Sequence, residues 1–378
     1  MGVPACKSVD AWRGAQPRGP TDLQATQTRV RTGRGRRYVA SLILCLAACA
    51  ASADTTRIAV FAAPLSRDGP GLLLRDLGRD DDQIDAIAAI IQHIRPDIVF
   101  LTDFDYDRDQ LALGQFAQRL GYPHHFAALP NTGMMTDQDL DQNGYLGDAR
   151  DAQGYGRFAG DGGMAILSNW PLTLREDFSQ LLWRDLDGAI MPPTPDSVAQ
   201  IQRLSTAAHW IIRVDHPQPF DLWTYAATPP VFDGPEDRNG LRNRDELRLW
   251  TQVMDRADTQ NFIIMGNTNL DPADGQGIRD AMQTFLADPR IQDPQPVSKG
   301  GTFAADADQS GDPALDTADW PDGKPGNLRV SYILPSAVFG IADKGVFWPA
   351  PDDPLAQLLG EDGLAAGPHR LVWVDIIH

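Results

Sequence analysis

The segment Phe262-Ile-Ile-Met-Gly-Asn-Thr-Asn-Leu-Asp271 carries the clearest structural signal in the sequence. Four apolar residues run directly into Gly266, and the polar residues Asn267, Thr268 and Asn269 follow. A short apolar run that ends in small and polar residues is typical of a buried strand in an α/β sheet, which presents polar side chains at its carboxyl end. We therefore expect a buried strand here, with Asn267 and Asn269 at a functional edge of the sheet.

Apolar runs on both sides of this segment predict further short strands. They span residues 57–63, 98–101, 163–168, 210–214, 222–226, 328–334, 345–348 and 369–376. Two amphipathic helices are expected, one between the acidic residues 80–82 and Pro96 and the other over 243–256, because apolar residues recur at helical spacing in both. Strands and helices alternate early and strands dominate later. This order predicts one continuous α/β domain over residues 54–378, with a sheet-on-sheet core and helices outside.

The first 53 residues have the features of a leader. Arg34, Arg36 and Arg37 precede an apolar run over 38–48, and Ala51-Ser-Ala53 follows. A basic region, an apolar region and an A-x-A site in this order predict a signal peptide and export to the periplasm or the extracellular space. The alternative is a lipoprotein anchored to a membrane at Cys49, because residues 46–49 resemble a lipobox. Residues 1–33 are interpreted as an over-long predicted start.

Composition narrows the classes of function. The three cysteines all lie in the leader, so disulfides, thiolate nucleophiles and Cys-ligated zinc are excluded for a chain cleaved after Ala53. The full chain carries a formal net charge of −18, and removal of the basic leader makes the remainder more acidic. Generic nucleic-acid binding is disfavoured, because its affinity comes largely from neutralised phosphates.

Six parts of the sequence, taken in order, resemble secreted bacterial members of the endonuclease/exonuclease/phosphatase superfamily, which has the DNase I-like fold. They span residues 55–77, 163–171, 228–240, 266–274, 317–321 with 326–330, and 369–373. The resemblance implies a four-layer α-β-β-α sandwich of two packed mixed sheets flanked by helices. It also implies hydrolysis of phosphate esters with Mg²⁺ or Mn²⁺, in which a carboxylate-bound cation stabilises charge on the phosphoryl oxygens.

The catalytic motifs implied by this resemblance are degenerate. Where the family has Asn, His and three Asp residues, this chain has Ala62, Ala226, Asn267, Ser331 and Pro368. Two positions are retained, the phosphate-binding amide and the histidine near the scissile phosphate, as Asn269 and His369. The family's metal-binding Glu is replaced by the shorter Asp103, so the candidate Mg²⁺ or Mn²⁺ ligands are Asp103 and Asp105.

These replacements favour a catalytically impaired protein. Loss of a general acid–base group typically costs about 10²- to 10⁴-fold in rate, and a lost electrostatic stabiliser costs on the order of 10²- to 10³-fold. We therefore interpret the chain as a pseudoenzyme whose phosphoester cleft binds a phosphorylated small molecule or a protein. The alternative is an active phosphodiesterase or phosphomonoesterase that uses the residues retained around a displaced metal, namely Asp103, Asp105, Asn269 and His369.

A separate motif lies in a polar insertion over residues 131–163. The sequence Asp139-Leu-Asp-Gln-Asn-Gly144 matches the opening of a calcium loop, although Arg150 stands at the twelfth position. A calcium-stabilised cell-surface binding protein is therefore a further alternative, and its candidate ligands are Asp139, Asp141, Asn143, Asp148 and Asp151. Without calcium, the insertion is expected to be a solvated loop or a lid anchored by Tyr155 and Phe158.

Overall fold

Residues 55–322 and 325–378 are described by the computed structural model. The predicted signal peptide, its cleavage site and Cys49 lie outside these residues, so export and lipid anchoring remain predictions. No helix within the described ranges combines the length and the apolar character needed to cross a membrane.

The first sheet contains β1 (Thr55–Leu65), β2 (Ile98–Phe104), β3 (His124–Phe126), β4 (Gly163–Ser168), β10 (Gly340–Val346) and β11 (Val372–Ile377). Its strand order is β10-β11-β1-β2-β4-β3. β1 and β2 are parallel, and the other neighbouring strands are antiparallel. The sheet is therefore mixed, with its parallel pair at the centre.

The second sheet contains β5 (Leu172–Asp177), β6 (His209–Val214), β7 (Phe220–Ala226), β8 (Phe262–Asn267) and β9 (Ser331–Pro335). The strands follow one another in sequence order, and only β7 and β8 are parallel. β1 contacts both β8 and β9, which brings the centres of the two sheets together.

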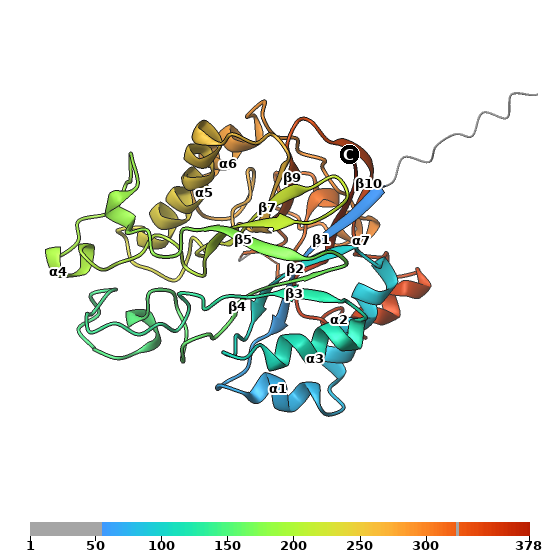
Figure 1. The fold of residues 1–378 in the computed structure, drawn as a ribbon, viewed down its shortest axis with the longest axis horizontal. Coiled ribbons are helices and arrows are strands. Elements are labelled where there is room, and N and C mark those ends of the chain that lie inside the picture. The colour runs from blue at the N-terminus through green and yellow to red at the C-terminus, as the bar shows by residue number, and fades with distance from the viewer. Residues whose placement is uncertain (1–54, 323–324) are drawn as a thin grey trace, which may run out of the picture. The chain divides into compact units, whose positions relative to one another are not determined.

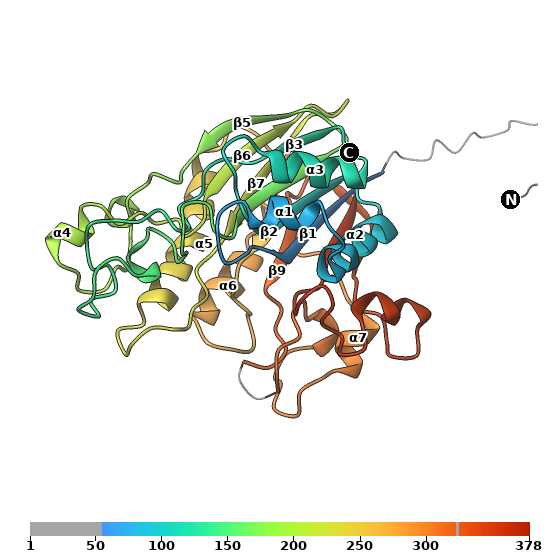
Figure 2. The same ribbon diagram turned by 90° about the horizontal axis from the view of Figure 1, so that it is seen from below.

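Helices cover the outer faces of both sheets, which gives the four layers expected from the sequence (Figures 1 and 2). The first sheet is covered by α1 (Leu72–Leu77), α2 (Asp82–Ile94) and α3 (Leu111–Leu120), and the second by α5 (Arg238–Arg256) and α6 (Arg279–Leu286). Short helices in the connections are α4 (Asp196–Ala199), α7 (Lys299–Phe303), η1 (Ala149–Asp151), η2 (Trp183–Asp185), η3 (Pro313–Leu315) and η4 (Pro354–Leu359).

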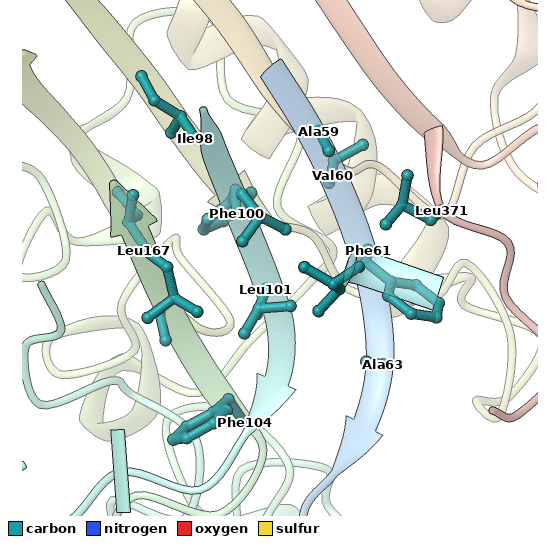
Figure 3. Close-up of a cluster of buried hydrophobic side chains, with 14 of the residues drawn as sticks. Ala59, Val60, Phe61, Ala63, Ile98, Phe100, Leu101, Phe104, Leu167 and Leu371 are labelled. Carbon is teal, nitrogen blue, oxygen red and sulfur yellow. The ribbon is translucent and has the colours of Figure 1, made fainter. Parts of the chain in front are cut away.

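The main apolar core is built on the first sheet and extends to the facing side of the second. Figure 3 shows part of it, where Phe61, Phe100 and Leu167 come from three neighbouring strands and Leu371 lies beside them. These four side chains are fully buried, and burial of each large apolar side chain contributes roughly 1.5–3 kcal/mol. A second apolar cluster lies between the second sheet and α5.

Side chains of β8 alternate between the two faces of the second sheet, and this alternation turns its final residue towards the first sheet. Ile263 and Met265 join the core that faces the first sheet, whereas Phe262 and Ile264 pack under α5. Because side chains alternate between faces along a strand, Asn267 continues the inward-facing series. The segment that gave the strongest signal in the sequence therefore ends with a polar side chain between the two sheets.

Most of the predicted elements are present, with shifted bounds. α2 begins after Asp81, whose carboxylate accepts a hydrogen bond from the backbone N–H of Ile84, as the acidic run predicted. The strands expected from 328 and 369 begin three residues later, because Leu328 and His369 each pair with Ala318 in isolated bridges instead. α5 begins five residues earlier than expected.

Candidate functional site

Three neighbouring strands of the second sheet end in a row of uncharged side chains. Ala226, Asn267 and Ser331 are directly paired across β7, β8 and β9. On the facing sheet, Ala62 of β1 is paired with Thr102 of β2. Asn267 and Ser331 are 8% and 0% exposed, so these positions are buried as well as neutral. The structure therefore places three of the replaced family positions side by side on the second sheet, and Ala62 lies on the facing sheet.

Several polar atoms in this region have no hydrogen-bond partner among the described residues. They include the side-chain oxygens of Thr102, Asn267 and Ser331. The backbone N–H of Ser331 is satisfied, since it donates to the hydroxyl of Thr317 over 3.0 Å. A buried polar group without a partner costs roughly 1–3 kcal/mol, so such groups in native proteins call for an explanation. Here they mark a polar patch at the sheet ends that a ligand or water can satisfy.

His369 lies beside this row without a carboxylate partner. Its ring packs edge-on against Trp320 with 5.1 Å between ring centroids, and its Nδ1 is buried without a partner in the described structure. Burial and the adjacent positive charge of Arg370 lower the pKa of His369 to about 4. The imidazole is therefore neutral at pH 7. Pro368, in place of the family's Asp, provides no side-chain acceptor that would favour a charged ring.

Asn269 connects two strand ends. Its side-chain amide donates a hydrogen bond of 2.7 Å to the carbonyl oxygen of Ala227. The residue has a φ of 51°, in the left-handed region that asparagine tolerates better than most residues. One of the two N–H groups of its amide is therefore engaged within the protein, and the other N–H group and the side-chain oxygen remain available to an external partner.

Asp103 faces a cavity of its own. It has a φ of 63°, and the pairing of β2 with β4 is irregular at this point. Together with Ser66, Arg67 and Asp161, it lines a cavity of about 640 Å³. Burial, with a contribution from the negative charges of Asp105 and Asp161, raises the pKa of Asp103 to about 7.

Asp105 is a buried structural carboxylate. It is 4% exposed, and its two oxygens accept hydrogen bonds from the backbone N–H groups of Arg67 (2.9 Å) and Gly162 (3.1 Å). Burial raises its pKa to about 6. Asp105 therefore joins two loops, and unlike Asp103 it is not among the residues that line the 640 Å³ cavity.

The residues at the family positions do not fit the divalent cation that the family resemblance implies. Mg²⁺ and Mn²⁺ take oxygen ligands, with carboxylates supplying the negative charge. Among the family positions only Asp103 provides a carboxylate, and its pKa is near neutral. Neither Asn269 nor His369 lines the cavity that Asp103 faces. The cavity that Asp103 faces is therefore lined by neither of the two retained family residues.

The acidic insertion forms a different cluster. One carboxylate oxygen from each of Asp139, Asp141 and Asp151 lies within 4.8 Å of the others. Asp151 is fully buried and accepts hydrogen bonds from the backbone N–H groups of Leu140 and Gly147. Three of the five predicted calcium ligands therefore converge.

The other two predicted calcium ligands, Asn143 and Asp148, lie next to this cluster. The side-chain nitrogen of Asn143 donates to Asp148 over 2.9 Å and to Asp141 over 3.1 Å. Tyr155, expected as an apolar anchor of the insertion, is 62% exposed and so does not anchor it. The insertion is held by polar contacts instead, since Asn131 donates to the carbonyl oxygens of Ser179 and Ser205.

A buried polar network on α5 was not predicted. Arg238, Arg242 and Glu246 follow one another at four-residue spacing, which places them on one face of the helix. Glu246 is fully buried and accepts hydrogen bonds from the backbone N–H groups of Thr206 and Thr228. The four-residue spacing of these charged residues, at the start of an amphipathic stretch, is the sequence pattern that could have predicted the network.

Comparison with known proteins agrees with this architecture. The sequence pattern of the endonuclease/exonuclease/phosphatase family matches residues 67–367. A solved structure from Beutenbergia cavernae DSM 12333, described as an endonuclease/exonuclease/phosphatase, is 16% identical with a TM-score of 0.51, covering 85% of this chain and 71% of that chain. None of the curated proteins matches the sequence.

Two structures from Bacteroides thetaiotaomicron are also similar. A protein of the same family is 12% identical with a TM-score of 0.49, covering 85% of this chain and 97% of that chain. The mannosyl-6-phosphatase of this organism is 12% identical with a TM-score of 0.47, covering 85% and 100%. Identities at this level concern the fold, whereas the family pattern covers most of the chain. The chain belongs to the endonuclease/exonuclease/phosphatase family.

Proposed function

We propose that this protein is an exported, catalytically impaired member of its family that binds a phosphorylated small molecule at the ends of the central strands. The observation that carries the proposal is the neutral row formed by Ala226, Asn267 and Ser331 on three adjacent strands. An amide, a hydroxyl and a methyl group hold no charge and accept no proton at neutral pH. The amide of Asn267 and the hydroxyl of Ser331 can donate hydrogen bonds, which is what binding a phosphate requires.

The size of the catalytic loss supports binding over turnover. Loss of one acid–base group costs about 10²- to 10⁴-fold. Such losses do not add within one catalytic unit, so the combined effect is set by what remains. What remains is His369, with a pKa of about 4, and Asn269, whose amide nitrogen is engaged with Ala227. Neither group stabilises the charge that develops on a phosphoryl oxygen as a bound cation or a charged side chain does.

A gain-of-function experiment tests the proposal. The purified protein is assayed with bis(p-nitrophenyl) phosphate and Mn²⁺, beside a variant that combines Ala62→Asn, Ala226→His, Asn267→Asp, Ser331→Asp and Pro368→Asp. We expect metal-dependent hydrolysis only in the variant. Binding of p-nitrophenyl phosphate, measured by calorimetry, should be weakened by Asn269→Ala in the unaltered background. Comparable turnover by the unaltered protein would rule the proposal out, whether or not the combined variant folds.

An active hydrolase is the alternative, and the position of Asp103 favours it. This carboxyl faces a cavity with Arg67, and a pKa of about 7 suits a group that exchanges protons at neutral pH. The alternative predicts Mn²⁺-dependent turnover that Asp103→Asn abolishes and Asp107→Asn leaves intact. His369 does not line that cavity, so a separate variant, His369→Ala, tests whether it contributes to the turnover.

A cation-stabilised insertion is a second candidate role, supported by the convergence of Asp139, Asp141 and Asp151. Calcium binding to the folded state raises the melting temperature, because a ligand of the native state stabilises it by mass action. We expect millimolar Ca²⁺ to raise the melting temperature and a chelator to reverse the effect. Asp141→Asn should remove this response, whereas the exposed Asp137→Asn should preserve it. An unchanged melting temperature in Ca²⁺ would dispose of this role.

Export is tested on the mature protein. We propose cleavage after Ala53, with lipid attachment at Cys49 as the alternative. Mass spectrometry of the protein recovered from the periplasm or medium should give an N-terminus at Asp54. An N-terminus at Cys49 that carries acyl chains would establish the lipoprotein instead, and an uncleaved leader would contradict both.

A further inference from the structure

A second cavity lies beside the acidic insertion, next to the cavity that Asp103 faces, with which it shares Tyr155. It has a volume of about 990 Å³ and extends between the acidic insertion and the first turn of α5. Its lining includes Arg238, Arg242, Gln202, Thr206, Phe232 and Tyr155. None of Ala62, Ala226, Asn267, Ser331, Asn269 or His369 lines it. Any ligand it takes is therefore bound by groups that the proposed phosphate site does not use.

Two buried guanidinium groups line this cavity. Arg238 and Arg242 are 6% and 7% exposed, and neither forms an ion pair with a described residue. Burial lowers the pKa of both, but an arginine remains charged throughout the physiological range. A buried charge is costly unless it is compensated. The negative charge of the buried Glu246 acts on Arg242, whereas the negative charges that act on Arg238 are those of Glu236, Asp141 and Asp233.

Arg238 is held in place by neutral partners and keeps unused donors. Its Nη1 donates to Gln202 Oε1 over 3.0 Å, and its Nη2 donates to the hydroxyl of Thr194 over 3.2 Å. These bonds use two of the five N–H groups of the guanidinium. The planar fork of donors that remains matches the oxygens of a carboxylate or a phosphate.

Arg242 lies in the cavity lining, where backbone carbonyl groups hold its guanidinium group. Its Nε donates to the carbonyl oxygen of Leu204, and its Nη2 donates to the carbonyl oxygens of Gln153 and Arg203. No described residue accepts a hydrogen bond from its Nη1. Thr206 and Thr228, whose hydroxyls hydrogen-bond each other, lie beside it in the same lining. The inner wall of the cavity is thus rich in donors and carries two guanidinium charges, of which that of Arg242 is opposed by the buried Glu246.

The mouth of the cavity carries exposed aromatic rings. Phe232 is 81% exposed and has a φ of 70°, a left-handed conformation that is unfavourable for a bulky residue. Strain of this kind persists where the surrounding structure enforces it, and it clusters at ligand sites. Tyr155, which is 62% exposed, also lines the cavity. These two rings offer flat apolar surfaces close to the buried cations.

Negative charges at the entrance limit the kind of anion that can enter. Asp233 and Glu236 are exposed and line the cavity, and Asp141 lies in the same lining. They oppose the approach of an extended polyanion, whose affinity depends on several phosphate contacts. A single anionic group that passes these carboxylates meets the two guanidinium groups behind them.

We propose that this cavity binds a small organic molecule with one carboxylate or phosphate group attached to a flat apolar ring. The anionic group is held by Arg238 and Arg242, and the ring contacts Phe232 and Tyr155. The site goes beyond the proposed phosphate site, because it lies at different residues and requires the ring as well as the charge. It is a binding site in which no bond of the ligand is broken.

Isothermal titration calorimetry with four probes tests the proposal. Phenyl phosphate and benzoate carry both features, inorganic phosphate lacks the ring, and phenol lacks the charge. We expect at least one aromatic anion to bind about ten-fold or more tightly than both inorganic phosphate and phenol, and the stronger of the two identifies the anionic group. No binding of either aromatic anion at about 10 mM would overturn the proposal.

Variants of the lining residues test whether the ligand binds in this cavity. Arg238→Gln should weaken binding about ten-fold or more, because it removes a charged donor pair. Phe232→Ser, at an exposed position that does not contribute to the core, should weaken binding of the aromatic anion and leave that of inorganic phosphate unchanged. Arg79→Gln, at an exposed arginine outside the cavity lining, is the matched control and should bind normally.

The other outcomes of the variant experiments each contradict the proposal. Unchanged binding in a folded Arg238→Gln variant would overturn the proposal, and if that variant does not fold, unchanged binding in Phe232→Ser would do so. Loss of binding in Asn269→Ala with full binding in Arg238→Gln would place the ligand at the strand ends. That result would contradict this inference while supporting the proposed function. Preference for single-stranded oligonucleotides over the mononuclear anions would also contradict it.

Discussion

At the scale of single residues, two fully buried serines differ in their hydrogen bonding. The hydroxyl of Ser331 has no partner among the described residues, whereas that of Ser205 lies 2.7 Å from Nδ1 of His209. We expect Ser331→Ala to raise the free energy of unfolding by about 1 kcal/mol, because it removes a buried hydroxyl that has no partner. Ser205→Ala should cost about 1 kcal/mol. Urea denaturation measures both.

The contrast between the serines also reports on the proposed phosphate site. A loss of 1 kcal/mol or more in Ser331→Ala would show that a bound water or ligand satisfies the hydroxyl in solution. Addition of phosphate during the measurement separates the two cases. Stabilisation of the unaltered protein by phosphate, reduced in Ser331→Ala, would assign the contact to the anion.

Arg242 is expected to be a major single contributor to stability. It donates to backbone carbonyl oxygens in two segments that approach α5, at Gln153 and at residues 203–205. Arg242→Met keeps most of the side-chain volume but leaves these buried acceptors without a donor. The cost should reach roughly 3–5 kcal/mol. Arg248→Met on the same helix loses one bond to an exposed carbonyl oxygen and should cost less than about 1 kcal/mol.

At the scale of elements, the start of α2 allows a controlled test among three adjacent aspartates. Only Asp81 caps the helix, through its bond to the backbone N–H of Ile84. Asp81→Ala should therefore lower the free energy of unfolding by about 1 kcal/mol, and Asp81→Asn by less, since asparagine also caps well. Asp80→Ala and Asp82→Ala should each lie within about 0.5 kcal/mol of the unaltered protein. Equal losses at all three positions would show that charge, and not the cap, matters.

The elements that could be predicted are those whose apolar pattern reflects burial. β8 follows directly from its apolar run, and α2 follows from its isoleucine face and acidic cap. β5 could not be predicted in this way, because it is an edge strand whose residues are almost all exposed. The first turn of α5 was missed because Arg238 and Arg242 are buried through hydrogen bonds, which leaves no apolar signal.

The candidate site was predictable in its parts but not in its assembly. The neutral replacements at Ala226, Asn267 and Ser331 can be read from the sequence, and the pairing of their strands makes them neighbours. The different roles of Asp103 and Asp105 cannot be read from the sequence, because they depend on a left-handed backbone at Asp103 and on the two N–H groups that donate to Asp105. The 990 Å³ cavity is formed by segments that are distant in the sequence, so no local sequence pattern predicts it.

At the scale of the whole molecule, buried carboxyl groups and buried histidines change the free energy of unfolding with pH in opposite directions. Burial raises the pKa of Asp103 and Asp316 to about 7, so the folded state retains these protons better than the unfolded chain. Their contribution to stability is present at low pH and is lost as pH rises through 7. Burial lowers the pKa of His209 to about 3 and of His369 to about 4, and these groups add stability as pH rises from about 4 to 6.5.

The two effects oppose each other in mildly acidic solution and separate near neutrality. An unfolded histidine is still half protonated at about pH 6.5, so the histidine contribution fades only by about pH 7.5. Between pH 6.5 and 8 we expect the contribution of Asp316, which is 1% exposed, to fall by about 1 kcal/mol. Asp316→Asn keeps an acceptor for Gln309 and should remove this part of the decline. Guanidinium or urea denaturation across this range measures it, with the exposed Asp308→Asn as control; a decline of equal slope in both variants would show that Asp316 ionises normally in the folded protein.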